Sequence, residues 1–212
     1  MIKHPRFPYQ LYLVIAESSC RKGDYLHVAE EAIRGGVDII QLREKDIGIE
    51  DYLLRARRLK EITDKHNVPL IINDNLAVAI QVEAFGIHVG RNDVSPQEIR
   101  KQWKECQSLG YSIEYLAQLE SEEAVAADCF GISPIFTTPT KTDTVTEWGI
   151  EGIKQIRQLT TKPLIAIGNM NLHNVEKVAD SGANCIAVVS AICAAENPQQ
   201  AAFDLKNKIL KG

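Results

Sequence analysis

Two cationic side chains and an amide follow one of the apolar runs of the chain, in the segment Gln41-Leu42-Arg43-Glu44-Lys45. Because side chains alternate along a β-strand, Gln41, Arg43 and Lys45 are expected on one face. Leu42 and Glu44 fall on the other. A forked guanidinium beside an ammonium group suits a phosphate or pyrophosphate ligand. Taken alone, the segment fits a solvated, charged strand end equally well.

Two aspartates follow the next two apolar runs, Asp74 directly after Asn73 and Asp93 shortly after residues 86–89. Mg²⁺ is commonly held by one or two carboxylates together with substrate phosphates, so Asp74 and Asp93 predict a Mg²⁺ site. Turn chemistry is the alternative, with Asp74 in an Asx turn and Asp93 capping a helix. A capping box at residues 95–98 already serves the next helix, which leaves Asp93 available for a ligand.

Further polar residues lie in the later part of the chain. The segment 133–149 is rich in Thr and Pro, lacks helical periodicity and is longer than most connections, so we expect it to close over a bound phosphorylated substrate. Gly168-Asn169 and Val189-Ser190 follow the last two apolar runs, where barrels commonly bind phosphate through backbone N–H groups. A tight turn at Gly168 and a helix cap at Ser190 are the alternatives.

Short apolar runs alternate with amphipathic stretches along the whole chain. Strands are predicted at 11–16, 37–42, 70–72, 86–89, 109–113, 129–132, 164–167 and 185–189, the fifth from a weak pattern. Helices are predicted at 24–36, 49–65, 97–104, 120–127, 150–159, 172–181 and 198–210. Apolar strands that each lead into a helix predict a (β/α)8 TIM barrel, as a single domain over residues 1–212. An open doubly wound sheet is the alternative, but no G-x-G-x-x-G motif follows the first run.

Composition excludes several classes of protein. The chain has 212 residues, of which 45% are hydrophobic and 25% charged, and its net charge of -4 gives no basic surface for nucleic acid or anionic membranes. No apolar run reaches the roughly 18 residues of a membrane span, and the first residues do not resemble a secretory signal, so a cytoplasmic protein is expected. The 5 cysteines are scattered without a C-x-x-C pair, which disfavours a disulfide framework and a zinc site. No feature of the sequence predicts an oligomeric state.

His88 and two cysteines are interpreted as core residues. His88 lies within one apolar run, and Cys129 and Cys185 lie within two others. A histidine in that setting is more often a packed or hydrogen-bonded core residue than a catalyst, and a buried thiol behaves as a small hydrophobe. The sequence presents no evident Cys–His or Ser–His arrangement for nucleophilic catalysis.

Together these motifs resemble the thiamine phosphate synthase family over essentially the whole chain. The likeness rests on residues 41–45, 73–74, 86–90 with Asp93, 131–136, 138–141 and 188–192. The resemblance implies a binding site for a pyrimidine diphosphate made of Gln41, Leu42, Arg43, Glu44, Lys45, Asn73, Ser112 and Lys141. It implies a binding site for a thiazole phosphate made of Thr138, Pro139, Thr140, Gly168, Asn169, Val189 and Ser190. It also implies that Asp74 and Asp93 bind Mg²⁺ and that Arg43, Lys45 and Lys141 carry the catalysis.

The resemblance further implies the reaction. The family joins 4-amino-2-methyl-5-hydroxymethylpyrimidine diphosphate to 4-methyl-5-(2-hydroxyethyl)thiazole phosphate, giving thiamine phosphate and pyrophosphate in a Mg²⁺-dependent, dissociative transfer. The expected partners are therefore two small phosphorylated substrates. The chain departs from the family pattern at Asn169, where a second glycine is usual, and around Ser112, where the fifth strand is hard to align.

Three other functions compete with this one. A thiazole tautomerase on the same barrel would not need the pyrophosphate-binding cations or the paired carboxylates. A phosphate-sugar isomerase or epimerase would need an acid–base pair or catalytic metal ligands, which these strand ends do not supply. A non-catalytic sensor of phosphorylated ligands would have no need to keep the metal-binding carboxylates.

Overall fold

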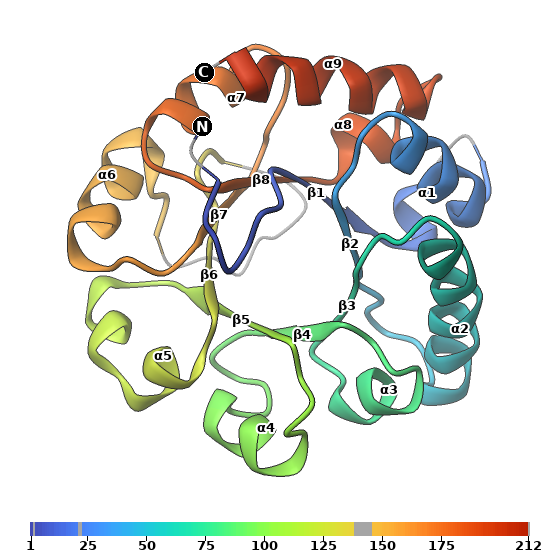
Figure 1. Ribbon diagram of the computed structural model, residues 1–212, viewed down its shortest axis with the longest axis horizontal. Helices are drawn as coiled ribbons and strands as arrows, with labels where there is room; N and C mark the ends of the chain where they lie inside the picture. Colours follow the sequence, from blue (N-terminus) through green and yellow to red (C-terminus); the bar gives the residue numbers. More distant parts are fainter. Residues whose placement is uncertain (2, 21–22, 138–145, 212) are drawn as a thin grey trace.

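The computed structural model describes residues 1, 3–20, 23–137 and 146–211, in which eight parallel strands close into a barrel (Figure 1). The strands are β1 (Leu11–Ile15), β2 (Ile39–Leu42), β3 (Leu70–Asn73), β4 (Gly86–Val89), β5 (Ser108–Ile113), β6 (Cys129–Ile132), β7 (Leu164–Ile167) and β8 (Cys185–Val188). Each pairs with the next, and β8 pairs with β1. The predicted (β/α)8 barrel is confirmed, and the open doubly wound sheet is excluded. The weak fifth segment is a full strand, paired on both sides.

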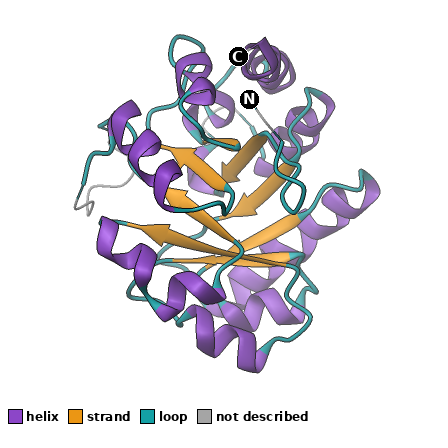
Figure 2. Cartoon of the chain, turned by 60° about the vertical axis from the view of Figure 1, so that its left-hand side comes forward, coloured by secondary structure: helices purple, strands orange, loops and turns teal. Residues whose placement is uncertain are grey.

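Helices cover the outside of the barrel (Figures 1 and 2). Among the described residues they are α1 (Tyr25–Arg34), α2 (Ile49–Lys65), α3 (Leu76–Gln81), α4 (Pro96–Gln102), α5 (Glu122–Ala126), α6 (Gly149–Leu159), α7 (Val175–Asp180), α8 (Ser190–Cys193) and α9 (Pro198–Lys211), with 3-10 turns η1 (Glu17–Ser19) and η2 (Leu116–Glu120). The sequence pattern does not predict α3 or α8, because helices of 6 and 4 residues are too short to display a 3.6-residue period. Within this part of the chain, none of the helices combines the length and hydropathy that crossing a membrane requires.

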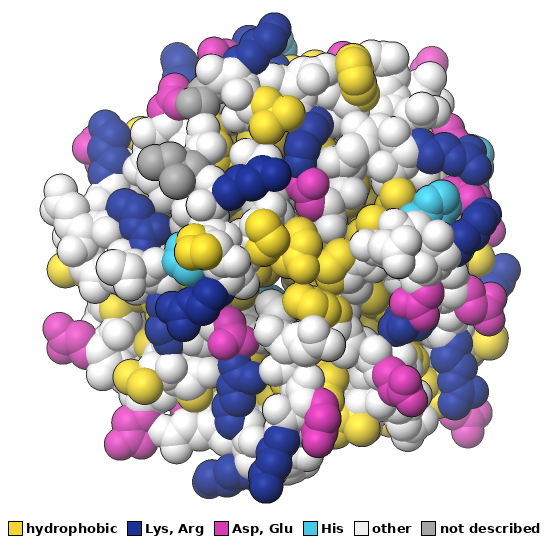
Figure 3. All heavy atoms as spheres, in the orientation of Figure 1, with side chains coloured by type: hydrophobic (Ala, Val, Ile, Leu, Met, Phe, Trp, Pro, Cys, Tyr) yellow, Lys and Arg dark blue, Asp and Glu magenta, His cyan; other side chains and the backbone are white. Residues whose placement is uncertain are grey.

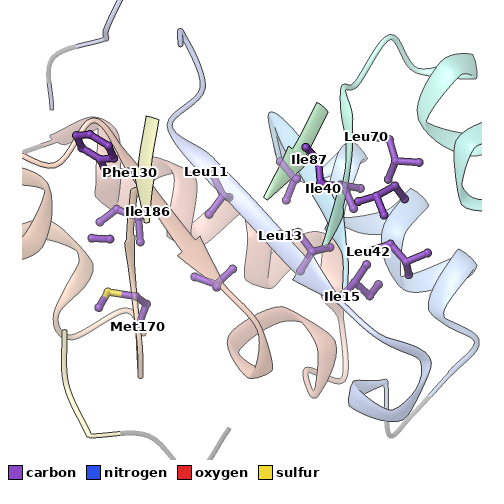
Figure 4. Packing of buried hydrophobic residues seen from close by; sticks show 14 of the residues in the cluster. Leu11, Leu13, Ile15, Ile40, Leu42, Leu70, Ile87, Phe130, Met170 and Ile186 are labelled. Carbon is purple, nitrogen blue, oxygen red and sulfur yellow. The ribbon is translucent and has the colours of Figure 1, made fainter. Parts of the chain in front are cut away.

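Alternate side chains of each strand enter two different cores. Leu11, Leu13 and Ile15 of β1 belong to the outer core, between the strands and the helices, part of which is drawn in Figure 4. Tyr12 and Val14 point into the barrel. Their partners there come from five other strands: Ile39, Ile71, Cys129, Ile165, Cys185 and Ala187. Because both faces of the strands are buried, the runs are apolar throughout, and both predicted core cysteines lie in the inner core.

Aromatic side chains fill the amino end of the barrel. Phe7 is 2% exposed and meets the ring of Tyr9 edge-on, with 4.9 Å between the ring centroids. Tyr9 in turn contacts Phe85, which immediately precedes β4. The N-terminal segment (dark blue) crosses this end in Figure 1, and hydrophobic side chains gather at the centre of the same face in Figure 3. Packing therefore closes the amino end, which in such barrels serves stability rather than chemistry.

Three polar side chains at the amino end tie neighbouring strands together. Each precedes an even-numbered strand, accepts a hydrogen bond from an N–H near the start of the preceding strand, and contacts a cationic side chain from a helix. They are Asp38 with Leu11 N (2.8 Å) and Lys206, Asp128 with Leu109 N (2.7 Å) and Arg100, and Asn184 with Leu164 N (3.0 Å) and Arg157. We call Asp38, Asp128 and Asn184 the strand brackets. They fix strand pairing at the end remote from the cavity described next.

Candidate active site at the carboxyl end of the barrel

A cavity of about 340 Å³ opens at the carboxyl end of the barrel. Its charged and hydrogen-bonding side chains come mainly from β2 to β5 and the loops that follow them. Apolar side chains of β1, β7 and β8 form another part of the wall: Val14, Ile165, Ile167 and Ala187. The lining includes these predicted site residues: Gln41, Arg43, Lys45, Asn73, Asp74, Asp93 and Ser112. The cavity thus has a polar wall suited to charged ligand groups and an apolar wall suited to rings.

The alternation predicted for residues 41–45 is confirmed, because the odd-numbered side chains line the cavity and the even-numbered ones do not. Leu42 is fully buried in the outer core. Glu44 forms an ion pair with Arg55 at 2.9 Å and accepts a hydrogen bond from the N–H of Glu17 at 2.9 Å. The side chains of Leu42 and Glu44 therefore hold the strand end in place and do not reach the cavity.

Asp74 and Asp93 lie side by side at the mouth of the cavity. Lys45 Nζ is 2.6 Å from Asp74 Oδ2, and the Gly90 N–H donates to Asp93 Oδ2 at 2.7 Å. Burial raises the pKa of Asp93 above its ordinary value, and the neighbouring Asp74 carboxylate adds to this shift. Asp74 has a left-handed backbone with a φ of 61°. That conformation is costly for a residue other than glycine and is frequent at functional sites.

The paired carboxylates fit Mg²⁺ better than a metal held by protein groups alone. In the described part of the chain, no set of three His, Cys, Asp or Glu side chains could hold a metal ion. Mg²⁺ needs no such set, because it is usually bound by one or two carboxylates while water and substrate phosphates complete its coordination. Asp74 and Asp93, beside Arg43 and Lys45 in the same lining, match that donor set.

Hydrogen bonds fix the ends of β2 and β3 and leave one donor unused. The Tyr52 hydroxyl lies 2.9 Å from the carbonyl oxygens of both Leu42 and Asn73 and so joins the two strand ends. Gln41 Nε2 donates to the Tyr12 hydroxyl at 2.8 Å. The Nδ2 group of Asn73 is buried and has no hydrogen-bond partner among the described residues. Buried donors are normally satisfied, so a ligand acceptor is expected at this position.

His88 lies in the cavity wall, which corrects the sequence interpretation of it as a core residue. His88 Nε2 is 2.9 Å from Ser112 Oγ, on the strand next to it. Glycines make room for the imidazole: a Cβ atom at Gly110 would lie 2.4 Å from His88 Nδ1, and one at Gly131 would lie 2.8 Å from Cε1. Glycine inside two neighbouring strands was the available signal. The lining also contains polar side chains that the sequence does not predict as site residues: Tyr12, Arg91, Asn92 and Glu114.

The residues predicted to bind a monophosphate lie at the ends of β7 and β8, which are neighbours in the barrel. Gly168 and Asn169 follow β7, and Val189 and Ser190 follow β8. None of these four belongs to the lining of the cavity in the described part of the chain. They therefore form a rim beside its apolar wall. The remaining predicted residues, Thr138, Pro139, Thr140 and Lys141, and most of the predicted lid lie outside the described residues.

Comparison with known proteins identifies the family. The family model described as thiamine monophosphate synthase matches residues 11–192. The chain belongs to this family. Among its relatives in the thiamine monophosphate synthase family, the thiamine-phosphate synthase of Albidiferax ferrireducens is 41% identical, with 94% of this chain and 91% of the relative covered. The thiamine-phosphate synthase of Vibrio parahaemolyticus is 40% identical, with 92% and 95% covered.

Solved structures agree with the family assignment. The thiamine phosphate pyrophosphorylase of Pyrococcus furiosus superposes with a TM-score of 0.88 at 25% identity, covering 98% of each chain. The 3-hexulose-6-phosphate synthase of Salmonella typhimurium superposes with a TM-score of 0.71 at 16% identity, covering 95% of this chain and 99% of that one. This second likeness reflects the barrel fold that the thiamine monophosphate synthase family shares with other enzymes.

Proposed function

We propose that this protein condenses 4-amino-2-methyl-5-hydroxymethylpyrimidine diphosphate with 4-methyl-5-(2-hydroxyethyl)thiazole phosphate, giving thiamine phosphate and pyrophosphate. The observation that carries the proposal is the polar wall of the cavity, where Arg43 and Lys45 face the same space as Asp74 and Asp93. The family membership and the names of its relatives support the same reaction. The two substrates are small molecules, and the cavity volume of about 340 Å³ lies within the range of ligand sites.

The diphosphate of the pyrimidine substrate is assigned to the polar mouth. Arg43 and Lys45, with Lys141 from the loop outside the described residues, bind its oxygens and disperse the negative charge that develops on the leaving group. Asp74 and Asp93 would hold Mg²⁺, which when bound supplies further neutralisation of that charge. Lys45 is paired with Asp74 at 2.6 Å, so ligand binding exchanges this ion pair for contacts with phosphate and metal.

The pyrimidine ring is assigned to the deeper part of the polar wall. Gln41, Asn73 and Ser112 offer neutral hydrogen-bonding groups there, which suit ring nitrogens and an amino group. Asn73 Nδ2 is buried without a partner among the described residues, so an acceptor on the ring or its diphosphate would satisfy it. The His88–Ser112 contact of 2.9 Å orients the serine hydroxyl on this wall.

The transfer itself needs no protein nucleophile. The bond between the methylene carbon and the pyrophosphate oxygen breaks, and its electron pair leaves with the pyrophosphate. The thiazole nitrogen then donates its lone pair to the cation-like carbon, which the electron-rich aminopyrimidine stabilises. The apolar wall formed by Val14, Ile165, Ile167 and Ala187 keeps water from this carbon. Electrostatic stabilisation and positioning therefore supply the rate.

The thiazole phosphate is assigned to the rim beside the apolar wall. Gly168, Asn169, Val189 and Ser190 lie there, and Thr138, Pro139 and Thr140 belong to the adjoining loop outside the described residues. The ends of the last two strands are the usual phosphate site of such barrels. A phosphate on the rim and a thiazole ring on the apolar wall would point the thiazole nitrogen toward the pyrimidine.

The competing functions explain less of the site. A thiazole tautomerase or a non-catalytic sensor gives no role to the adjacent carboxylates of Asp74 and Asp93, which share the nearby cation Lys45. An isomerase or epimerase has no need of a metal–diphosphate site, so Arg43 and Lys45, which face the same space as Asp74 and Asp93, favour the transfer reaction over it.

The test is turnover by the purified protein with both phosphorylated substrates and Mg²⁺, followed by release of pyrophosphate and formation of thiamine phosphate. Asp74→Asn and Lys45→Ala should each lower kcat by about 10²–10³, the usual effect of removing one group that stabilises developing charge. Lys104→Ala and Asp180→Asn, at exposed positions, are matched controls and should leave kcat unchanged. Absence of product from folded protein would contradict the proposal.

A further inference from the structure

Asn169 occupies a backbone conformation that normally requires glycine. It is an exposed residue directly after the turn that ends β7, and its φ is 52°. Left-handed backbone is unfavourable for residues with a side chain, although asparagine tolerates it better than most. A residue in this state is expected to be held by its surroundings.

Two side-chain amides hold Asn169 from one direction. Its carbonyl oxygen accepts hydrogen bonds from Asn174 Nδ2 at 2.9 Å and from Asn171 Nδ2 at 3.2 Å. Asn174 Oδ1 accepts the N–H of Asn171 at 2.9 Å, and Asn171 Oδ1 accepts the N–H of His173 at 2.9 Å. We call Asn171 and Asn174 the asparagine clamp. Because each amide is fixed at both of its ends, the clamp is a rigid support for the carbonyl of Asn169.

Close packing holds the same turn from its two other sides. Gly168 has a φ of 120°, and a Cβ atom there would lie 2.8 Å from Pro134 Cα and from Ile135 N. Met170, on the other side of Asn169, is 5% exposed and anchored in the outer core, as Figure 4 shows. The turn of residues 168–170 therefore has little freedom once the clamp is in place.

Three consecutive backbone donors of this turn are unused. The N–H groups of Gly168, Asn169 and Met170 form no hydrogen bond with any other described residue. Because a peptide unit is planar and trans, the clamp on the Asn169 carbonyl turns the Met170 N–H to the opposite side. Successive N–H groups around a left-handed residue form a concave donor set that suits an anion.

We infer that Asn171 and Asn174 are positioning residues for phosphate binding: the asparagine clamp holds Asn169 left-handed, so that the backbone N–H groups of residues 168–170 face the phosphate monoester of the second substrate. This inference rests on the proposed function for the identity of that substrate. The clamp side chains act on phosphate binding through Asn169, to whose carbonyl oxygen both donate.

The test titrates inorganic phosphate into the full-length protein and follows the backbone amide signals of residues 168–170 by NMR. Without the clamp, the left-handed conformation of Asn169 should be about tenfold less favoured over its other conformations. Asn174→Ala should therefore weaken phosphate binding about tenfold. Turnover should show a matching rise in KM for the thiazole phosphate and a nearly unchanged KM for the pyrimidine diphosphate. Asn171→Ala provides the same test if Asn174→Ala does not fold.

Rescue separates positioning from a general loss of structure. Glycine adopts the left-handed region without support, so the double variant Asn169→Gly/Asn174→Ala should regain phosphate affinity. Asn197→Ala is the matched control, because it removes an amide that accepts the Gln200 N–H at 2.9 Å at the start of α9, and it should leave phosphate affinity unchanged. Unchanged affinity in Asn174→Ala, or weakened affinity that Asn169→Gly does not restore, would overturn the inference, as would a wild-type protein that binds no phosphate. If phosphate responds as expected but no thiamine phosphate forms, the clamp stands and the proposed reaction fails.

Discussion

Asp74 and Asp93 place two carboxylates side by side at the mouth of the cavity, where burial and the Asp74 charge raise the pKa of Asp93. We expect Asp93→Asn to raise the thermal midpoint without Mg²⁺ by about 2–4 °C, the change that 1 kcal/mol gives in a domain of this size. The asparagine oxygen can still accept the Gly90 N–H, so the change mainly removes repulsion. Calorimetry with and without Mg²⁺ checks this, and Mg²⁺ should stabilise the wild type more than the variant. An equal response of both proteins to Mg²⁺ would contradict the role assigned to the pair.

Single residues were predictable where strand alternation alone decides their direction. Arg43 and Lys45 reach the cavity for that reason, and Asp74 lies there because it directly follows a strand. The hydrogen bond expected of His88 is confirmed, but its place in the wall and not in the core depends on space left by Gly110 on the neighbouring strand, which the apolar sequence around His88 does not reveal. The support of Asn169 depends on side chains that fold back along the turn, which the pattern of hydrophobic residues does not encode.

At the scale of elements, the strand brackets stabilise the barrel by joining neighbouring strands to one another and to a helix. Asp38→Ala would leave the N–H groups of Gln10 and Leu11 without their carboxylate acceptor and release Lys206. We expect a loss of about 2 kcal/mol in the free energy of unfolding, since unpaired buried donors typically cost 1–3 kcal/mol. Urea denaturation measures this, with Asp180→Ala on the exposed side of α7 as the control. KM for either substrate should not change, because the brackets lie at the opposite end of the barrel. A large change in KM with an unchanged free energy of unfolding would contradict the assignment of stability to the brackets and of substrate binding to the opposite end.

The eight strands could be predicted because both of their faces are buried, which makes each run apolar over its whole length. The short helices α3 and α8 could not be predicted from the sequence, and the strand brackets could not be predicted either. Asp38 and Leu11 are 27 residues apart, and Asp128 and Leu109 are 19 residues apart, so each contact exists only after the strands have paired. Local sequence patterns record the strands but not these contacts between them.

At the scale of the whole molecule, ligand binding at one end should stabilise the entire barrel. Mg²⁺ and pyrophosphate together should raise the thermal midpoint more than the sum of their separate effects, because each supplies part of the other's site. A ligand present at 100 times its dissociation constant adds about 2.7 kcal/mol to the free energy of unfolding. Differential scanning calorimetry on the wild type and on Asp74→Asn checks this, and the variant should lose the joint effect. Additive shifts in the wild type would argue against a shared metal–pyrophosphate site.

The contact between Asp38 and Lys206 joins positions 168 residues apart in the chain. At 5–20 residues per second, a ribosome delivers Lys206 about 8–34 s after Asp38. During that interval β1 and β2 exist without the helix that completes their bracket, and until Val188 has been added β1 also lacks its partner β8. An unpaired strand edge of this kind can join other chains. We therefore expect each newly made copy to carry an exposed edge on β1 for most of this interval, until pairing with β8 closes the barrel and ends its exposure to aggregation.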